Sequence, residues 1–138
     1  MSTSNPAGAT TGSIRVSAAV IVNDQDELLL VRKAGTTAFM QPGGKPEPGE
    51  SPRETLSREL LEELGLAVDA AELQPLGLFT AAAANEPGFL VVADVFEVAI
   101  GDQVPVISAE IEELRWVARA DAGELEIAPL ARDNFLPG

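Results

Sequence analysis

The segment that most constrains this chain is GKPEPGESPRETLSRELLEELGL, residues 44–66, because it carries signals for both ends of a helix. Ser51 precedes Pro52 and lies three residues before Glu54, which makes a capping box with proline at the first helical position. Gly65 supplies the left-handed residue that ends many helices. The sequence therefore predicts a helix that begins at Pro52 and stops before Gly65.

Leucines at helical spacing give this segment an apolar stripe. We expect the helix to pack against the rest of the fold through this stripe, which consists of Leu56, Leu60, Leu61 and Leu64. Just upstream, prolines and glycines at 42–44 and 46–49 predict a stiff, turning loop. Its glycines let backbone carbonyls approach a ligand closely.

Three glutamates, Glu59, Glu62 and Glu63, lie within little more than one turn of the predicted helix. Residues spaced i, i+3 and i+4 share a face, so we expect their carboxylates in one small patch on the solvent-facing side. Like charges at this spacing repel one another. A cation would make the arrangement favourable, and oxygen-only ligands suit Mg²⁺ or Mn²⁺. The segment is thus predicted to hold a metal.

The same segment resembles the Nudix box at every specified position. The matching residues are Gly44, Glu50, Arg58-Glu59-Leu60, Glu62-Glu63 and Gly65-Leu66. From average residue usage, a chance match at a given start has a probability on the order of 10⁻¹⁰, so coincidence is negligible. The resemblance implies a loop-helix-loop that holds divalent cations against a diphosphate.

The resemblance also implies roles for individual positions. The expected metal ligands are the box glutamates and a backbone carbonyl just before the box, namely Glu59, Glu62, Glu63 and Gly43. Arg58 is expected to steady these carboxylates, since ligands need outer groups to orient them. Glu50 is expected to brace the loop against the helix. Gly44 and Lys45 are expected beside the substrate.

Another glutamate is expected downstream of the box. In many Nudix hydrolases, a glutamate shortly before a tryptophan-containing strand supplies a further metal ligand or the base that deprotonates water. Trp116 marks such a strand here, and Glu110 is the first choice for this catalytic role, with Glu112 second. Glu97 and Glu86 stay open as other bases, and a solvated acidic stretch is the structural alternative.

A basic residue ends the strand expected before the box. In several Nudix enzymes a basic residue at this place contacts substrate phosphate, which makes Arg32 a candidate for substrate binding, followed by Lys33 and Lys45. A solvated charge that closes a strand explains each of these residues as well.

The composition narrows the chemistry. The chain has 22 acidic and 9 basic residues and a formal net charge of −13, so it should repel nucleic-acid polymers. The expected partner is a small nucleotide or diphosphate that docks through metal ions. Because the chain has no Cys and no His, disulfides, thiolate zinc sites and a histidine base are excluded. Carboxylates are left to perform acid-base chemistry.

With 138 residues, the chain is long enough for one domain. We expect residues 1–13, which are small, polar and uncharged, to form a flexible N-terminal tail before a Nudix domain at 14–138. The tail lacks the basic start and apolar core of a secretory signal. No apolar run approaches the roughly 20 residues that cross a membrane. These features predict a soluble, cytoplasmic protein without a membrane partner, with a homodimer as one option for its assembly.

Apolar and β-branched runs predict the other elements, which are strands at 14–22, 27–33, 73–80, 89–98 and 110–117 and a short helix at 128–135. A turn at 23–26 suggests that the first two strands form a hairpin. Leu28 to Val31 show no alternation, which indicates burial on both faces. The small residues at 81–88 predict a loop that lines or covers a pocket.

These elements predict an α/β fold with a mixed sheet between helices, and the resemblance specifies the alpha-beta-alpha Nudix sandwich. It implies hydrolysis of a phosphoanhydride in a nucleoside diphosphate linked to another group, with a nucleoside triphosphate favoured, as in MutT-type pyrophosphohydrolases. The alternative is a Nudix-fold nucleotide-binding or regulatory module without turnover. The asparagine that recognises the oxidised purine in MutT has no clear counterpart near Ala128 and Pro129, so the substrate stays open.

Overall fold

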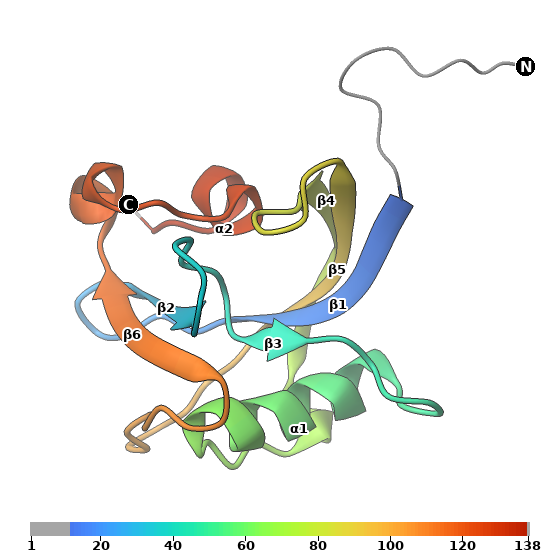
Figure 1. The fold of residues 1–138 in the computed structure, drawn as a ribbon. Helices are drawn as coiled ribbons and strands as arrows, with labels where there is room; N and C mark the ends of the chain where they lie inside the picture. Colours follow the sequence, from blue (N-terminus) through green and yellow to red (C-terminus); the bar gives the residue numbers. More distant parts are fainter. Residues whose placement is uncertain (1–11, 138) are drawn as a thin grey trace, which may run out of the picture.

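The computed structural model describes residues 12–137. Figure 1 shows two helices on opposite sides of two strongly curved sheets. In chain order, the elements are β1 (Gly12–Val20), β2 (Leu28–Lys33), β3 (Gly43–Gly44), α1 (Pro52–Leu64), the 3-10 helix η1 (Ala70–Glu72), β4 (Gln74–Ala82), β5 (Phe89–Glu97), β6 (Ile111–Val117), the 3-10 helix η2 (Arg119–Glu124) and α2 (Pro129–Asn134).

The larger sheet has the strand order β3-β1-β5-β4. Its central pair, β1 and β5, is parallel, whereas β3 and β4 pair antiparallel with their neighbours. The second sheet consists of the antiparallel strands β2 and β6. The predicted α/β fold with a mixed sheet is therefore confirmed.

Two apolar clusters explain how the helices cover the sheets. Leu28 and Leu30 of β2 belong to the cluster under α2, and Leu29 and Val31 belong to the cluster under α1. All four side chains are buried, as their lack of alternation predicts. Strand β2 therefore contributes side chains to both layers of the core, one under each helix, which gives the alpha-beta-alpha arrangement.

Helix α1 follows its sequence signals closely. It begins at Pro52, and Ser51 and Glu54 form both hydrogen bonds of the capping box. Gly65 ends it with φ of 65°, and its N–H donates to carbonyls of the last turn. Of the predicted apolar stripe, Leu56, Leu60 and Leu64 are fully buried, but Leu61 is 57% exposed. The inclusion of Leu61 in the stripe was wrong, because α1 is covered on one side only.

The predicted hairpin between the first two strands forms only at its turn, and β1 and β2 belong to different sheets. The chain does turn back after β1, since Val22 bridges Leu28 and the N–H of Leu29 donates to the carbonyl of Ile21. The strands then diverge, and β1 pairs with β5 while β2 pairs with β6. The turn residues determine only that the chain reverses its direction at this point. The strand that pairs with β2 is decided by the need to bury β2 on both faces.

The glycines before α1 form a strand rather than only a loop. Gly43 and Gly44 make β3, in which they lie opposite Ala18 and Ser17 of β1. Gly43 has φ of 148°, and a Cβ at this position would overlap the carbonyl oxygen of Ser17. The loop prediction failed here because glycine usually marks a turn, whereas at this point it permits close contact between backbones.

Two further observations concern the predicted N-terminal tail and the absence of a membrane-spanning helix among the described residues. Residues 1–11 of the predicted tail lie outside the described residues, and residues 12 and 13 belong to β1. Within residues 12–137, no helix is long and apolar enough to cross a membrane.

Burial along α1 gives a direct test of the packing. We expect Leu60→Ala to lower the free energy of unfolding by about 2–5 kcal/mol, because it leaves a cavity at a fully buried position. Leu61→Ala is the matched control on the same helix and should change it by less than about 0.5 kcal/mol. Urea unfolding measures both values, and equal losses would contradict this account of which face of α1 is buried.

Candidate active site

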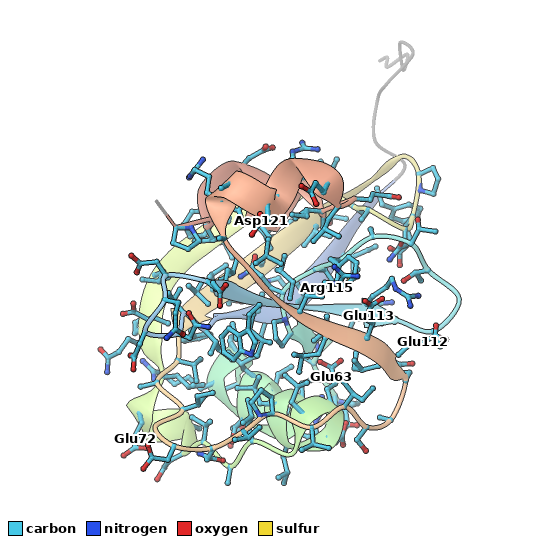
Figure 2. All side chains as sticks on the ribbon, turned by 90° about the vertical axis from the view of Figure 1, so that its left-hand side faces the viewer. Glu63, Glu72, Glu112, Glu113, Arg115 and Asp121 are labelled. Carbon is cyan, nitrogen blue, oxygen red and sulfur yellow. The ribbon has the colours of Figure 1, made fainter. Side chains whose placement is uncertain are left out.

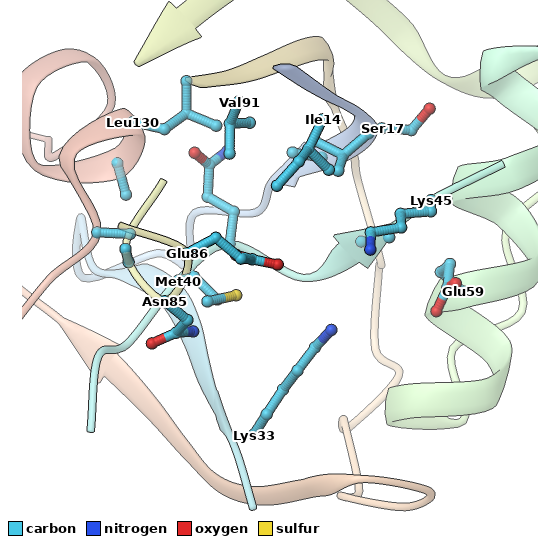
Figure 3. A pocket seen from close by; sticks show the side chains of 18 of the residues that line it. Ile14, Ser17, Lys33, Met40, Lys45, Glu59, Asn85, Glu86, Val91 and Leu130 are labelled. Atoms are coloured by element: carbon cyan, nitrogen blue, oxygen red, sulfur yellow. The ribbon is translucent and has the colours of Figure 1, made fainter. Parts of the chain in front are cut away.

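A cavity of about 660 Å³ lies between α1 and α2. Figure 3 shows its two ends, with Lys45 and Glu59 on one side and Val91, Leu130 and the 83–88 loop on the other. Charged or glycine residues from the box region line one end, namely Gly43, Gly44, Lys45, Glu47, Arg58 and Glu59. The opposite end includes the apolar residues Ile14, Val16, Val91, Leu130 and Ala131, and the 83–88 loop adds Ala84, Asn85 and Glu86 to its wall. The cavity thus joins a polar end to an apolar end.

Arg58 connects the parts of the polar end. Its Nε donates to Glu50 Oε2 at 2.6 Å, and its Nη2 donates to Glu50 Oε1 at 3.0 Å and to the carbonyl of Lys45 at 3.1 Å. Its Nη1 donates to Glu59 and to Glu62, each at 3.2 Å. One guanidinium therefore holds the preceding loop and two box carboxylates in a fixed relation.

Glu50 completes this connection from the loop side. Its Oε1 accepts hydrogen bonds from the backbone N–H of Glu47 at 2.8 Å and from the hydroxyl of Thr55 at 2.9 Å. The bonds from Arg58 and these donors lower the pKa of Glu50 to about 2. The carboxylate raises the pKa of Arg58 further above its usual value in return. Glu50 thus stays ionised and ties the loop to α1.

Two of the box carboxylates point inward. Glu63 is only 3% exposed and accepts a hydrogen bond from the N–H of Gly43 at 3.3 Å. Burial raises its pKa to about 8, and the nearby charge of Glu59 adds to the shift. Burial also raises the pKa of Glu59, against the opposing effect of Arg58. Both groups would gain from a nearby cation.

The expectation that Glu63 faces solvent was therefore wrong. Glu63 lies three residues after Leu60 and seven after Leu56, so it shares their buried face of α1. In Figure 2, Glu63 lies on the inner side of α1, whereas Glu112 and Glu113 project from β6.

The expectation of a single patch of three carboxylates was also wrong. The Glu62 side chain is about half exposed and pairs with Arg58, which lies four residues earlier on the helix. Among residues 12–137, no three acidic side chains are gathered closely enough to form a ready-made metal site. Nη1 of Arg58 contacts both Glu59 and Glu62, so Glu62 differs from the inward pair, Glu59 and Glu63, in its greater exposure.

The donors at this end nevertheless suit Mg²⁺ or Mn²⁺. All are oxygen atoms, which are the ligands that these cations prefer. Two belong to carboxyl groups with raised pKa values, which means that their ionised forms are unfavourable unless a cation lies nearby. Gly44 leaves space for one of them, because a Cβ at this position would overlap the carboxylate of Glu59. Glu59, Glu63 and the backbone at Gly43 are therefore the residues best placed to hold a cation.

Glu110 and Lys33 lie together on another side of the cavity. Glu110 directly precedes β6, and its carboxylate is 3.5 Å from the Nζ of Lys33. Both residues line the cavity, and the charge of Glu110 contributes slightly to the raised pKa of Glu63. Of the other acidic candidates, Glu86 lines the cavity, whereas Glu97 and Glu112 do not.

Arg32 is not brought to the cavity. Its guanidinium donates to the carbonyl of Thr36 at 2.8 Å and pairs with Glu112 at 3.1 Å and Glu113 at 3.2 Å. Lys33, the next residue, lines the cavity instead. Neighbouring residues of a strand point to opposite faces, and the register of β2 and β6 also shifts between Arg32 and Lys33.

Sequence analysis missed Gln41, which also lines the cavity. It is 7% exposed, and its Nε2 donates to the carbonyl of Ala19 at 2.9 Å. Among the described residues, its Oε1 is the one buried side-chain oxygen or nitrogen without a hydrogen-bond partner. The sequence did offer one signal, because Gln41 is a polar residue directly before Pro42-Gly43-Gly44. It was not used, because a buried connection between strands was not expected there.

Comparisons with known proteins identify relatives of this chain. Residues 13–137 match the model of the NUDIX domain. A Bacillus subtilis protein named "Putative 8-oxo-dGTP diphosphatase" is 31% identical over 100 residues, which cover 72% of this chain. The 8-oxo-dGTP diphosphatase of Haemophilus influenzae is 39% identical over 64 residues, or 44% of this chain. The matches span 62% and 47% of the lengths of these two relatives.

Solved structures show the same fold. The crystal structure of a MutT protein from Methanosarcina mazei Go1 has a TM-score of 0.71 and 28% identity, and the match covers 90% of this chain and 91% of that chain. The solution structure of the Escherichia coli ORF135 protein has a TM-score of 0.66 and 27% identity, with 94% of this chain and 89% of that chain covered.

The pKa of Glu50 leads to a prediction for acid stability. Since its folded-state pKa of about 2 lies below the ordinary 4.5, Glu50 stabilises the fold above pH 4.5, and this contribution is lost as the pH falls toward 2. We expect Glu50→Gln to flatten the dependence of the unfolding free energy on pH in this window. Arg58→Gln should have the same effect, because Arg58 is the main cause of the shift.

Urea unfolding at several pH values measures this slope. The double variant should show no further flattening beyond either single variant, because both substitutions remove the same interaction. An unchanged slope in Glu50→Gln would contradict the assignment.

Proposed function

This chain belongs to the NUDIX domain family, and on that basis we propose that it is a metal-dependent pyrophosphohydrolase that cleaves a phosphoanhydride bond in a nucleoside triphosphate or a related nucleotide. The observation that carries the proposal is the complete box, with Glu59 on the wall of the cavity and Glu63 buried against the backbone N–H of Gly43, which also lines the cavity. A cavity of about 660 Å³ falls within the range of small-molecule sites.

The names of the relatives support the reaction class. Besides the two diphosphatases, the RNA pyrophosphohydrolase of Proteus mirabilis is 44% identical over 48 residues, although these cover 35% of this chain and 27% of that protein. All three names denote hydrolysis of a diphosphate linkage. The net charge of −13 favours a small nucleotide over an RNA polymer for this chain.

We assign the metal ligands to Glu59 and Glu63 together with the Gly43 carbonyl, with Glu62 at the outer edge. A bound Mg²⁺ or Mn²⁺ would neutralise the diphosphate and lower the pKa of a water molecule. Arg58 holds Glu59 in position through the hydrogen bond at 3.2 Å. This anchoring orients the inner carboxylate toward the polar end of the cavity.

Other residues of the cavity contact the substrate in this proposal. Glu110 takes a proton from the attacking water, and Lys33 and Lys45 offset the charge of the phosphates. Gly44 lines the cavity beside Lys45, and its lack of a side chain leaves room for the carboxylate of Glu59. We assign no phosphate contact to Arg32, because its guanidinium pairs with Glu112 and Glu113. The apolar end then accepts the ring of the nucleotide base.

The alternative function is a nucleotide-binding or regulatory module without turnover. It would use the same cavity and would not require intact box glutamates. Direct measurement of pyrophosphate or phosphate release from nucleoside triphosphates, ADP-ribose, dinucleoside polyphosphates and nucleotide sugars separates the two functions. Binding of a nucleotide without any release would favour the module.

The inward carboxylates give the central prediction. We expect turnover to require Mg²⁺ or Mn²⁺ and to be abolished by Glu59→Gln and by Glu63→Gln. Glutamine keeps the size and the hydrogen-bonding groups of the side chain and removes only its ability to ionise, so both variants should fold. Wild-type protein should also unfold at a higher temperature when the cation is present, because the ligand binds only the folded state.

Glu97→Gln is the matched control, because Glu97 is exposed at the end of β5 and lies outside the cavity. It should retain both the turnover and the cation-dependent rise in melting temperature. Near-normal rates in both box variants would overturn the assignment of the metal ligands.

The position of Glu110 gives a second prediction. We expect Glu110→Gln to slow turnover by at least about tenfold, as is typical for loss of a general base. Glu112→Gln, two residues away, should remain close to wild type because Glu112 pairs with Arg32 outside the cavity. Steady-state rates at saturating substrate make the comparison. If Glu110→Gln is unaffected, the base is another group, and Glu86 is the next acidic residue on the cavity wall.

A further inference from the structure

Strand β4 forms a free edge of the larger sheet. It lies last in the order β3-β1-β5-β4 and pairs only with β5. Among residues 12–137, no other strand or loop forms a backbone hydrogen bond with the outer side of β4. Every second residue of such a strand points its N–H and C=O groups away from the sheet. An edge of this kind can pair with another strand.

The edge lacks the features that usually prevent pairing. No charged residue occurs between Leu73 and Asn85, although 31 of the 138 residues of the chain are charged. Pro75 and a register shift between Pro75 and Gly77 interrupt only the start of β4. The stretch from Leu78 to Ala82 keeps a regular register, and Leu78 is 58% exposed. This stretch therefore offers a regular and uncharged edge.

Side chains on the face of β4 that packs toward α2 hold this strand in place. Phe79 is partly buried and packs against the core cluster under α2, and its ring contacts that of Phe135 with centroids 4.8 Å apart. The strand therefore needs no rearrangement before it pairs, which reduces the entropy cost of association.

From these observations we propose that β4 is the interface of a homodimer in which two copies join their sheets through antiparallel pairing of residues 78–82. Two copies of a chain with net charge −13 repel one another over most of their surfaces, and this uncharged edge is where they meet at the least cost. An antiparallel pair of identical strands is self-complementary and closes with two copies. Thr80, at the centre of the stretch, lies next to its counterpart.

The first test compares two variants of equal net charge. We expect light scattering after size exclusion to give a dimer for the wild-type chain. Leu78→Glu should raise the dimer dissociation constant by at least about tenfold, because charged side chains on an edge strand oppose pairing. Val104→Glu adds the same charge at a side chain that is 77% exposed in a separate loop, and it should remain dimeric.

A second test exploits the absence of cysteine from the chain. Facing residues in antiparallel strands have Cα atoms about 4.5–5.5 Å apart, which lies within the range of about 4.4–6.8 Å found in disulfides. Thr80→Cys should therefore give a covalent dimer under mild oxidation, whereas Val104→Cys should cross-link much more slowly. Reducing and non-reducing gels measure the difference.

Three results would overturn the proposal. These are a wild-type chain that is monomeric at every concentration, a Leu78→Glu variant that remains dimeric, and equal rates of cross-linking for the two cysteine variants. Leu78, Thr80 and Val104 do not line the cavity, so the outcome is independent of the proposed hydrolase activity. Circular dichroism of each variant confirms that the fold is intact.

Discussion

The paired hydrogen bonds between Arg58 and Glu50 fix the arrangement on which the candidate site depends. Glu50 belongs to the loop before α1, and Arg58 belongs to the helix itself. Because Arg58 also contacts the carbonyl of Lys45 and the carboxylate of Glu59, the loop, the glycine strand and the inner carboxylate cannot move independently. A bidentate ion pair of this kind fixes the relative orientation of its two side chains as well as stabilising their contact.

Features encoded by neighbouring residues could be predicted from the sequence. The capping box at Ser51 and the stop at Gly65 form as expected, because their hydrogen bonds join residues a few positions apart. The pairing of β1 and β2 could not be predicted in the same way. It depends on which distant strands cover the apolar faces of Leu28 to Val31, and a turn at 23–26 carries no information about those strands.

The same distinction applies to the candidate site. The box shows which carboxylates lie in the last turns of α1, but whether each points inward depends on partners from other segments. Glu63 is buried and accepts a hydrogen bond from the N–H of Gly43, whereas Glu62 is about half exposed beside Arg58. Gln41 was missed because its burial results from contact with the backbone of β1, and its position before Pro42-Gly43-Gly44 does not by itself reveal that distant partner.

The separation of the cavity into two ends has a consequence for how substrate range can diverge. The apolar end is formed by residues such as Leu130 of α2, Val91 of β5 and Ala84 of the 83–88 loop, whereas the network around Arg58 belongs to the opposite end. Substitutions at Ala84 or Leu130 would therefore reshape the space offered to a ring without disturbing the carboxylates. Changes in a few small or apolar side chains can then direct the same reaction to new nucleotides, while the carboxylates and the network around Arg58 stay unchanged.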